Sequence, residues 1–233
     1  MAEIDIAPEI SANIKKSYNA YVSKDKRIAQ LEKNLAKKSN WADANEFATR
    51  HGEALVKAVR DNVSAEILPD GMMYYNIAEK VLPDSLITSE HIIEEYALKV
   101  QQKMLEDGGY HIKALKPDHN ADRVRGIVDL ASSKPYDEVK DQLYEVMKNY
   151  DQSIVDATIQ KNAELLNDLG VYAMVTRIYD GVGLHDGKQP CQWCIERAGT
   201  WTYEEANANG VFERHTGCGC TIVYTLPDRT DIL

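Results

Sequence analysis

The chain has 233 residues, of which 44% are hydrophobic and 27% charged, proportions that are ordinary for a soluble globular protein. Its formal net charge of −10 repels nucleic-acid phosphates on average, which argues against a general nucleic-acid coat protein. No apolar run approaches the roughly eighteen residues of a membrane span, and residues 1–5 lack the pattern of a secretory signal. We therefore expect the protein to be made in a cytosol, where cysteines stay reduced.

Residues 1–170 are predicted to be mostly helical. Ile10 and Ile14 recur at helical spacing, and Ile28, Leu31 and Leu35 do so further along. A second stripe follows a predicted N-cap at Asn40 and should stop before the turn signal Pro69–Gly71. The apolar face of this second helix contains Ala44, Phe47, His51, Leu55, Val59 and Val63.

Two further helices are predicted in the middle of the chain. One covers Met72–Leu82 and should end by Pro83, because proline disfavours a helix interior. The next begins near Ser89 and should end at Gly108–Gly109. Tyr110–Leu115 is predicted to be a short strand.

The sequence changes character at Gly170, after a short helix at Asp122–Ala131 and a long helix that Pro135 opens. Val171–Tyr179 is rich in β-branched and aromatic residues and is predicted to be a strand, as is Thr221–Thr225. The expected fold is therefore α+β, with a helical domain over 1–170 and a small β-rich module over 171–233.

A basic stretch interrupts the acidic chain between Ile14 and Lys38. It contains eight lysine or arginine residues against two acidic residues, Asp25 and Glu32. A charge run of this kind is most often a solvated helix face. The alternative is a contact surface for DNA or for an acidic protein. The basic residues are Lys15, Lys16, Lys24, Lys26, Arg27, Lys33, Lys37 and Lys38.

All four cysteines of the chain lie in one thirty-residue window. Cys191 and Cys194 form a C-x2-C pair, and His215, Cys218 and Cys220 form an H-x2-C-x-C group. Zn²⁺ takes four tetrahedral nitrogen or sulfur ligands, and paired ligands two residues apart are typical of zinc sites. We therefore predict one structural zinc ion, since four filled positions leave none open for catalysis.

The sequence offers five candidate ligands for four positions. Either the four cysteines bind the ion, or His215 replaces Cys218 or Cys220. The fifth residue would then support the ligands from outside. Two disulfides are the alternative in an oxidising setting, and four free core thiols are another.

Two enzymatic interpretations are also open. Pro190–Cys194 matches one half of the signature of zinc-dependent nucleic-acid deaminases, and His51-Gly52-Glu53 matches the other half. The two halves are far apart in sequence, and His51 lies on an apolar stripe. A nuclease would need a second, exposed ion, for which His185 and Asp186 are the nearest candidates. We favour neither interpretation.

The C-terminal residues resemble the closing domain of the Mu F-like minor head proteins of tailed phages. The family pattern runs from a helix with an asparagine, through a glycine and a strand, to C-x-x-C and then H-x-x-C-x-C. In this chain the order is Asn162, Gly170, the strand to Ile178, Asp180-Gly181, Cys191, Cys194, Gly199 and Val211–Cys220. The resemblance covers about the last seventy residues.

This resemblance implies a minor component of the phage head, located in the virion near the portal. Such a protein would act in head assembly and in DNA packaging or delivery, through binding rather than catalysis. Its partners would be the portal, other head proteins and DNA, with Lys15, Lys16, Lys24, Lys26 and Arg27 as contact candidates. Some relatives carry a toxin or enzyme domain after this module, and we expect none beyond Leu233.

The chain departs from the family pattern at two positions. Thr216 stands where the family often has a proline, and Gly219 stands where it often has an arginine. Both changes bear on the subfamily more than on the metal.

Overall fold

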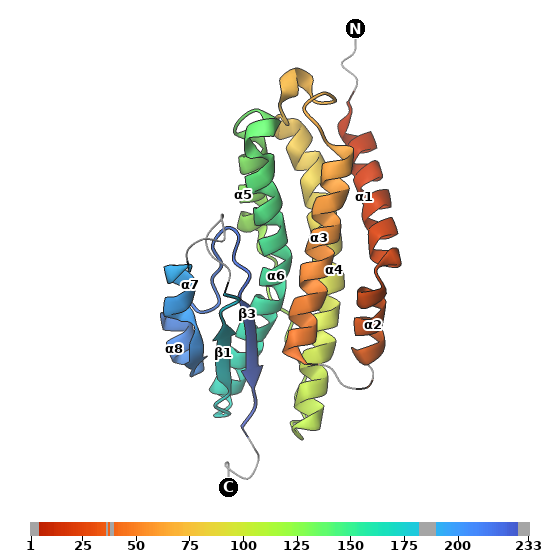
Figure 1. Ribbon diagram of the computed structural model, residues 1–233. Coiled ribbons are helices and arrows are strands. Elements are labelled where there is room, and N and C mark those ends of the chain that lie inside the picture. The colour runs from red at the N-terminus through yellow and green to blue at the C-terminus, as the bar shows by residue number, and fades with distance from the viewer. Residues whose placement is uncertain (1–4, 36, 38–39, 182–189, 228–233) are drawn as a thin grey trace.

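Long helices lie side by side to form the body of the molecule, and a small sheet lies against them near one end (Figure 1). The computed structural model describes residues 5–35, 37, 40–181 and 190–227. Of the described residues, 67% are helical, and they include one three-stranded antiparallel sheet. The predicted α+β class is therefore confirmed. No helix in the described ranges is long and apolar enough to cross a membrane.

The helices follow in chain order, with one short 3-10 turn at Pro69–Gly71. They are α1 (Ala7–Lys24), α2 (Lys26–Leu35), α3 (Trp41–Asn62), α4 (Tyr75–Asp107), α5 (Ala121–Ser132), α6 (Tyr136–Asp168), α7 (Gln192–Arg197) and α8 (Tyr203–Ala208).

The N-terminal helices agree with the predicted apolar stripes. Ile10 and Ile14 of α1 are buried, and α3 begins where Asn40 caps it by accepting a hydrogen bond from the Asp43 backbone N–H. Every member of the predicted second stripe is buried, so α3 lies at the centre of the bundle. It packs against α1, α4 and α6.

The predicted break at Pro83 is wrong. One continuous helix, α4, runs from Tyr75 to Asp107 with Pro83 inside it. A proline in a helix interior costs about 3 kcal/mol because it removes one backbone hydrogen bond. Val81, Leu82 and Leu86 are all fully buried on either side of it. Burying each such side chain contributes about 1.5–3 kcal/mol, which outweighs the cost of the proline.

The strand predicted at Tyr110–Leu115 is also wrong. The segment follows α4 without regular structure, and side-chain amides replace a partner strand. Asn162 of α6 accepts from the Leu115 N–H and donates to the Leu115 carbonyl, both at 2.8 Å. Gln102 of α4 accepts from the Ala114 N–H at 3.0 Å. Tyr110, Ile112 and Ala114 of this segment pack against the hydrophobic core of the helices.

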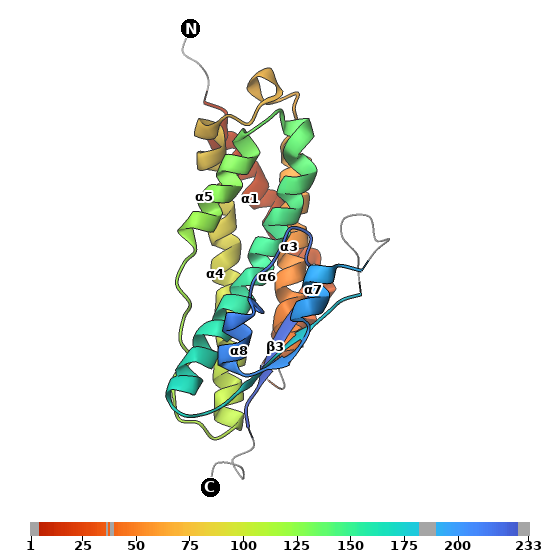
Figure 2. The ribbon, with the colours of Figure 1, turned by 90° about the vertical axis from the view of Figure 1, so that its left-hand side faces the viewer.

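The sheet consists of β1 (Met174–Ile178), β2 (Gly199–Trp201) and β3 (Thr221–Thr225) in the order β2-β1-β3. Both predicted strands are present, although the first is shorter than Val171–Tyr179. Val175 in the central strand pairs with Tyr224 on one side and with Trp201 on the other. The helices α7 and α8 lie outside the sheet and form the outer surface of this region (Figures 1 and 2).

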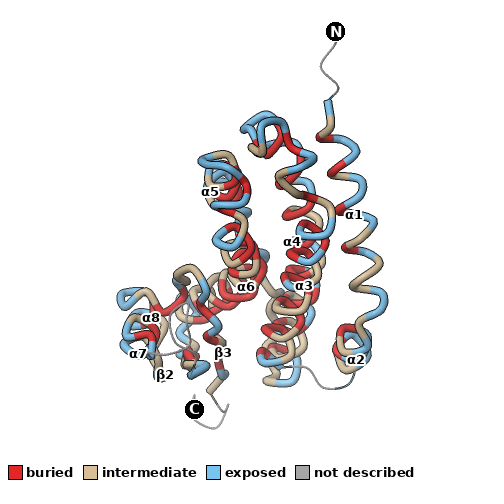
Figure 3. The backbone as a smooth tube through the Cα atoms, turned by 45° about the horizontal axis from the view of Figure 1, so that its top comes forward, coloured by how far each residue is buried: buried red, intermediate tan, exposed pale blue. Residues whose placement is uncertain are grey.

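The sheet shares the hydrophobic core of the helices. Tyr224 packs against Trp41 with ring centroids 5.5 Å apart, and the Asn45 amide donates to the Ile222 carbonyl at 2.8 Å. Buried residues run along the inner faces of the helices (Figure 3). Val175 and Ile222 of the sheet belong to the same buried cluster as the helical residues. The domain boundary near Gly170 stays a prediction.

Candidate metal centre

All five predicted ligands lie close together and could hold a metal ion. Cys191, Cys194 and His215 form one group of neighbouring donor atoms, and Cys194, Cys218 and Cys220 form another. Cys194 belongs to both groups, so it is the central residue of the cluster. The four thiols are buried and form a cluster of their own, separate from the main hydrophobic core.

The distances suit a tetrahedral ion. The His215 Nε2 atom lies 3.3 Å from the Cys191 sulfur and 3.0 Å from the Cys194 sulfur. The sulfurs of Cys194 and Cys218 are 3.8 Å apart. Metal–ligand bonds of 2.0–2.3 Å at tetrahedral angles place neighbouring ligand atoms about 3.5–3.8 Å apart. Small movements would therefore accommodate an ion between these atoms.

The local structure of the C-x2-C segment fixes its thiols. Cys191 is the N-cap of α7, and Cys194 lies in the first turn of that helix. The Cys191 backbone N–H donates to the Tyr179 hydroxyl at 3.1 Å, and the Cys191 carbonyl accepts from the Ile195 N–H at 3.0 Å. Both sulfurs are thereby presented from one turn of backbone.

A tight turn positions the second half of the cluster. The Cys218 N–H donates to the His215 carbonyl at 3.1 Å, and Gly217 adopts φ = 74°, a left-handed conformation that favours glycine. Gly219 is needed for a different reason. A Cβ atom at Gly219 would lie 2.0 Å from a carboxylate oxygen of Asp180, so a side chain cannot enter without displacing that carboxylate.

The ring of His215 is oriented for ligation. Its Nδ1 atom lies 2.8 Å from the Thr216 carbonyl oxygen, which can only accept a hydrogen bond. Nδ1 therefore carries the proton in the neutral ring, and the lone pair of Nε2 faces the two sulfurs. Metal-binding histidines are commonly held in this way.

Positive charge surrounds Cys218. The Arg177 guanidinium, buried on β1, donates to the Cys218 sulfur at 3.1 Å and to the Glu213 carbonyl at 2.7 Å. A hydrogen bond with Cys220 and the charges of Arg214 and Arg177 lower the pKa of Cys218 to about 5. Its anionic form is therefore favoured, as metal binding requires.

The pKa values of two neighbouring thiols, Cys194 and Cys220, are raised instead of lowered. Burial, together with the charge of Cys218, raises the pKa of Cys194 to about 12. The hydrogen bond to Cys218 and burial also raise the pKa of Cys220. One thiolate among buried thiols is the arrangement expected before a cation enters, because several close anions would repel one another.

Two contacts attach the cluster to α6. Arg214 and Asp156 form a fully buried ion pair, with the Arg214 Nη2 atom 3.0 Å from an Asp156 oxygen. The Asn149 amide donates to the His215 carbonyl. Sequence reasoning missed these residues, and the sequence held no signal for them, since Asp156 and Arg214 are far apart in the chain and resemble ordinary surface charges.

Comparisons with protein-family models, curated proteins and solved structures find no match to this chain. The metal site is therefore inferred from the residue types and geometry of the cluster.

The other predicted site residues lie elsewhere. His51 is buried in the helical core, where its Nδ1 atom lies 2.6 Å from the Tyr18 hydroxyl and its ring packs on Phe47. It belongs to neither group of metal-capable residues found in the described chain, and Glu53 is exposed on the same helix. His185 and Asp186, the residues considered for a nuclease, lie outside the described residues.

The basic stretch divides into two kinds of residue. Lys15, Lys16, Lys24 and Lys26 are exposed, as a contact surface requires. Arg27 instead forms two hydrogen bonds with Glu46, so its charge is already paired. Of the remaining basic residues, Lys33 and Lys37 are exposed, whereas Lys38 lies outside the described part of the chain.

Proposed function

We propose that the cluster of Cys191, Cys194, His215, Cys218 and Cys220 is a structural zinc site. The observation that carries the proposal is the meeting of two three-residue groups at Cys194, with donor atoms at 3.0–3.8 Å. Sulfur-rich, tetrahedral donor sets select zinc over magnesium, calcium and manganese. Burial of all four thiols favours a closed, structural ion rather than a catalytic one with an open position.

Metal analysis of the full chain, purified without chelator, tests the zinc proposal. We expect about one zinc per chain and four thiols recovered under denaturing conditions. Cys194→Ser should remove the metal, because Cys194 belongs to both groups. Ser153→Cys, which adds a thiol away from the cluster, is the control for thiol counting. A metal-free chain with no recoverable thiols would mean disulfides and would refute the proposal.

We further propose that the protein is a minor head protein of a tailed phage, acting by binding in head assembly and in DNA packaging or delivery. The support is the resemblance of residues 162–220 together with the clustering of the ligand residues that carry it. Asn162, which also belongs to the pattern, is buried and holds the backbone at Leu115. The zinc module would then serve as a rigid attachment on the helical body.

The partner contacts in this proposal are the exposed lysines of α1 and of the start of α2. Lys15, Lys16, Lys24 and Lys26 make no ion pair with any residue in the described ranges, so their charges are available to an acidic partner or to DNA. Lysines that neutralise phosphates release counterions, which makes such binding weaken steeply with salt.

Binding measurements distinguish a specific contact at these lysines from a general effect of the net charge of the protein. Lys15→Glu with Lys16→Glu should weaken co-purification with the portal protein or binding to DNA. Lys113→Glu with Lys134→Glu, at two exposed positions elsewhere, is the matched control. If both double variants lose the same amount of binding, the lysines of α1 are not a specific contact surface. Absence of the chain from purified phage particles would refute the head assignment while leaving the zinc site standing.

A further inference from the structure

A cavity of about 140 Å³ lies where α4, α5 and α6 meet the C-terminal segment. Glu90 of α4, Arg123 of α5 and Tyr150 of α6 line it, and Phe212 of the C-terminal segment forms part of its wall. Ligand sites occur preferentially at such junctions between parts of a structure. Whether each polar group in the lining has a partner within the protein therefore shows what the cavity could bind.

Arg123 is the unusual member of this lining. Arg123 is partly buried, and burial lowers the pKa of its guanidinium. No carboxylate in the described chain forms an ion pair with it. The negative charge of Asp156 attracts Arg123. Both Asp156 oxygens, however, already accept hydrogen bonds from Arg214. A partly buried cation that has no carboxylate paired with it favours a bound anion.

The other buried or partly buried arginines differ from Arg123. Arg27 and Arg50 pair with Glu46, and Arg214 pairs with Asp156. Arg177 donates to two backbone carbonyls and a sulfur. Arg197 also has no carboxylate partner, but it donates to the Trp193 carbonyl at 3.2 Å and stacks on the Trp193 ring.

The acidic wall of the cavity is already satisfied. Glu90 accepts a hydrogen bond from the Tyr150 hydroxyl at 2.6 Å, and its oxygens lie 2.8 and 2.9 Å from the Nδ1 atom of His119. These contacts give both oxygens of the Glu90 carboxylate a hydrogen-bond partner. Asp118 is exposed, so water screens it. The charge that lacks a partner in the cavity is therefore positive.

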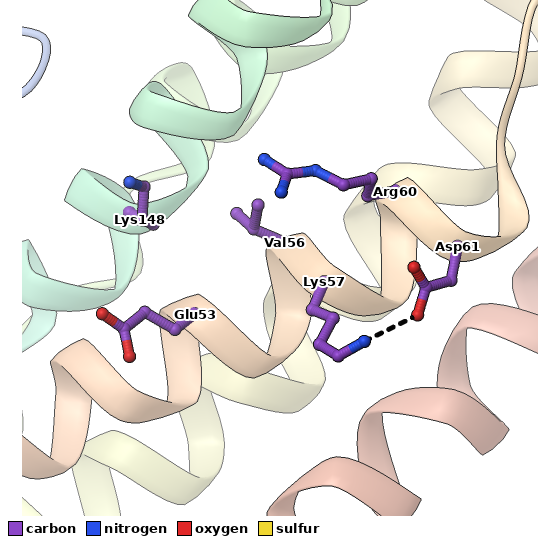
Figure 4. Close-up of a pocket in the computed structure, with 6 residues that line it drawn as sticks. All are labelled: Glu53, Val56, Lys57, Arg60, Asp61 and Lys148. Atoms are coloured by element: carbon purple, nitrogen blue, oxygen red, sulfur yellow. Dashed lines mark hydrogen bonds and ion pairs between the residues drawn. The ribbon is translucent and has the colours of Figure 1, made fainter.

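A larger cavity makes a useful contrast. It has a volume of about 480 Å³ and lies between α3 and α6 (Figure 4). There Lys57 pairs with Asp61 at 3.1 Å, and Lys148 pairs with Glu145 at 2.5 Å. Arg60 is exposed to water. These cations are compensated or solvated, so the larger cavity does not require an anion.

The size of the smaller cavity limits its ligand. Drug-sized ligands occupy pockets of about 300–1,000 Å³, whereas a water molecule takes about 30 Å³ of liquid. A volume of 140 Å³ therefore suits a small ion better than a nucleotide. A guanidinium binds carboxylates and phosphates through two parallel hydrogen bonds. We infer that Arg123 binds a small oxyanion, either inorganic phosphate or a small carboxylate, in this cavity.

Titration calorimetry of the full chain with sodium phosphate and with sodium acetate, against sodium chloride at equal ionic strength, tests this inference. We expect saturable binding of at least one of the two oxyanions and none of chloride. Arg123→Gln should weaken that binding by at least about tenfold, because a charge-assisted hydrogen-bond pair is lost. Arg125→Gln, on the exposed side of the same helix, should bind as the unaltered chain does. Heat from phosphate alone or from acetate alone would identify which oxyanion the site prefers.

Two outcomes would overturn the inference. One is the lack of any oxyanion signal above that of chloride, and the other is equal binding by Arg123→Gln and the unaltered chain. If Arg123→Gln fails to fold, Ala157→Leu decides the matter. Ala157 lines the cavity, so a leucine there fills the space while leaving the arginine in place. Binding that persists in Ala157→Leu would contradict a site in this cavity.

Discussion

Gly219 shows how a single residue can be required by its neighbour rather than by its own backbone. The space that its side chain would need is filled by the Asp180 carboxylate, which lies in the loop after β1. A Cβ atom at position 219 therefore requires the Asp180 carboxylate to move.

Gly219→Ala should destabilise the protein by about 0.5–1.5 kcal/mol, the net contribution of one hydrogen bond, because the Asp180 carboxylate must leave its present position. It should also weaken metal retention because Cys218 and Cys220 flank Gly219. Gly126→Ala is the opposite-sign control. No atom lies within 4 Å of a Cβ built at Gly126, an exposed position in α5. That change should stabilise by about 0.5–1 kcal/mol through helix propensity. Chemical denaturation of both variants measures the difference, and a neutral Gly219→Ala would contradict the packing argument.

A second residue-scale feature is the buried polar group in the helical core. Asp151 of α6 is fully buried and accepts a hydrogen bond from Ser89 of α4 at 2.7 Å. Burial raises the pKa of Asp151 to about 8, from an ordinary value of 3.8. Nearby, burial lowers the pKa of His51 to about 4, from 6.5. Both groups are therefore neutral in the folded state near pH 7.

These two pKa shifts act on stability with opposite signs. Between about pH 4 and 8 the folded state keeps a proton on Asp151 that the unfolded chain releases, so the free energy of unfolding falls as pH rises. Between about pH 4 and 6.5 the unfolded chain binds a proton at His51 that the folded state does not, so stability rises with pH. Above about pH 6.5 only the Asp151 effect of this pair remains.

Asp151→Asn should therefore gain stability relative to the unaltered chain as pH rises from 6.5 to 8. The upper limit is about 1.4 kcal/mol per pH unit, the linkage value for one proton. Urea denaturation at several pH values gives the difference directly, and taking the difference cancels the other titrating groups. Parallel curves for the two proteins across that interval would show that Asp151 ionises normally.

At the scale of elements, one buried ion pair joins the cysteine-bearing segment to α6. The side chains of Arg214 and Asp156 are 0% and 2% exposed, so solvent does not screen their interaction. Removing one partner of such a pair leaves the other charge buried without compensation. The pair lies beside Cys218, because Arg214 also donates to the Cys218 carbonyl at 3.4 Å.

Arg214→Met should cost about 3–5 kcal/mol and also lower metal retention. The double variant Arg214→Met, Asp156→Leu should recover much of that loss, since no buried charge remains. Lys140→Met, which removes an exposed ion pair with Asp137, should change stability by less than about 1 kcal/mol. A double variant no more stable than Arg214→Met would place the cost in lost packing instead.

At the scale of the whole molecule, the thiol cluster and the main core are separate hydrophobic clusters. The helices bury their own apolar faces, and Val175 and Ile222 tie the sheet into that core without any cysteine. The metal is thus expected to order the segment from Cys191 to Cys220 rather than the bundle.

Removal of metal by a chelator should therefore leave most of the helical circular dichroism signal in place. Trp193 should report the change, because its ring lies edge-on to His215 with centroids 5.1 Å apart and packs under Arg197. We expect its fluorescence to shift on chelation and the shift to be absent in Trp193→Phe. Collapse of the helical signal together with the fluorescence change would show that the bundle depends on the metal.

Local patterns in the sequence were sufficient for much of this fold and for the cluster of residues that could hold a metal ion. Apolar residues at helical spacing predicted α3 and α6, and the amide of Asn40 marked a helix start, because helix formation and capping depend on neighbours in the chain. The spacing of Cys191, Cys194, His215, Cys218 and Cys220 predicted a shared site, because paired ligands need short loops.

The features that only the tertiary structure decided depend on residues far apart in the sequence. Burial on both sides of Pro83 kept α4 continuous, and the amide of Asn162 took the place of a partner strand at Leu115. The ion pair of Arg214 with Asp156 and the uncompensated charge of Arg123 follow from which helices lie side by side. Spacing along the chain encodes local geometry, whereas burial and charge pairing are properties of neighbours in space.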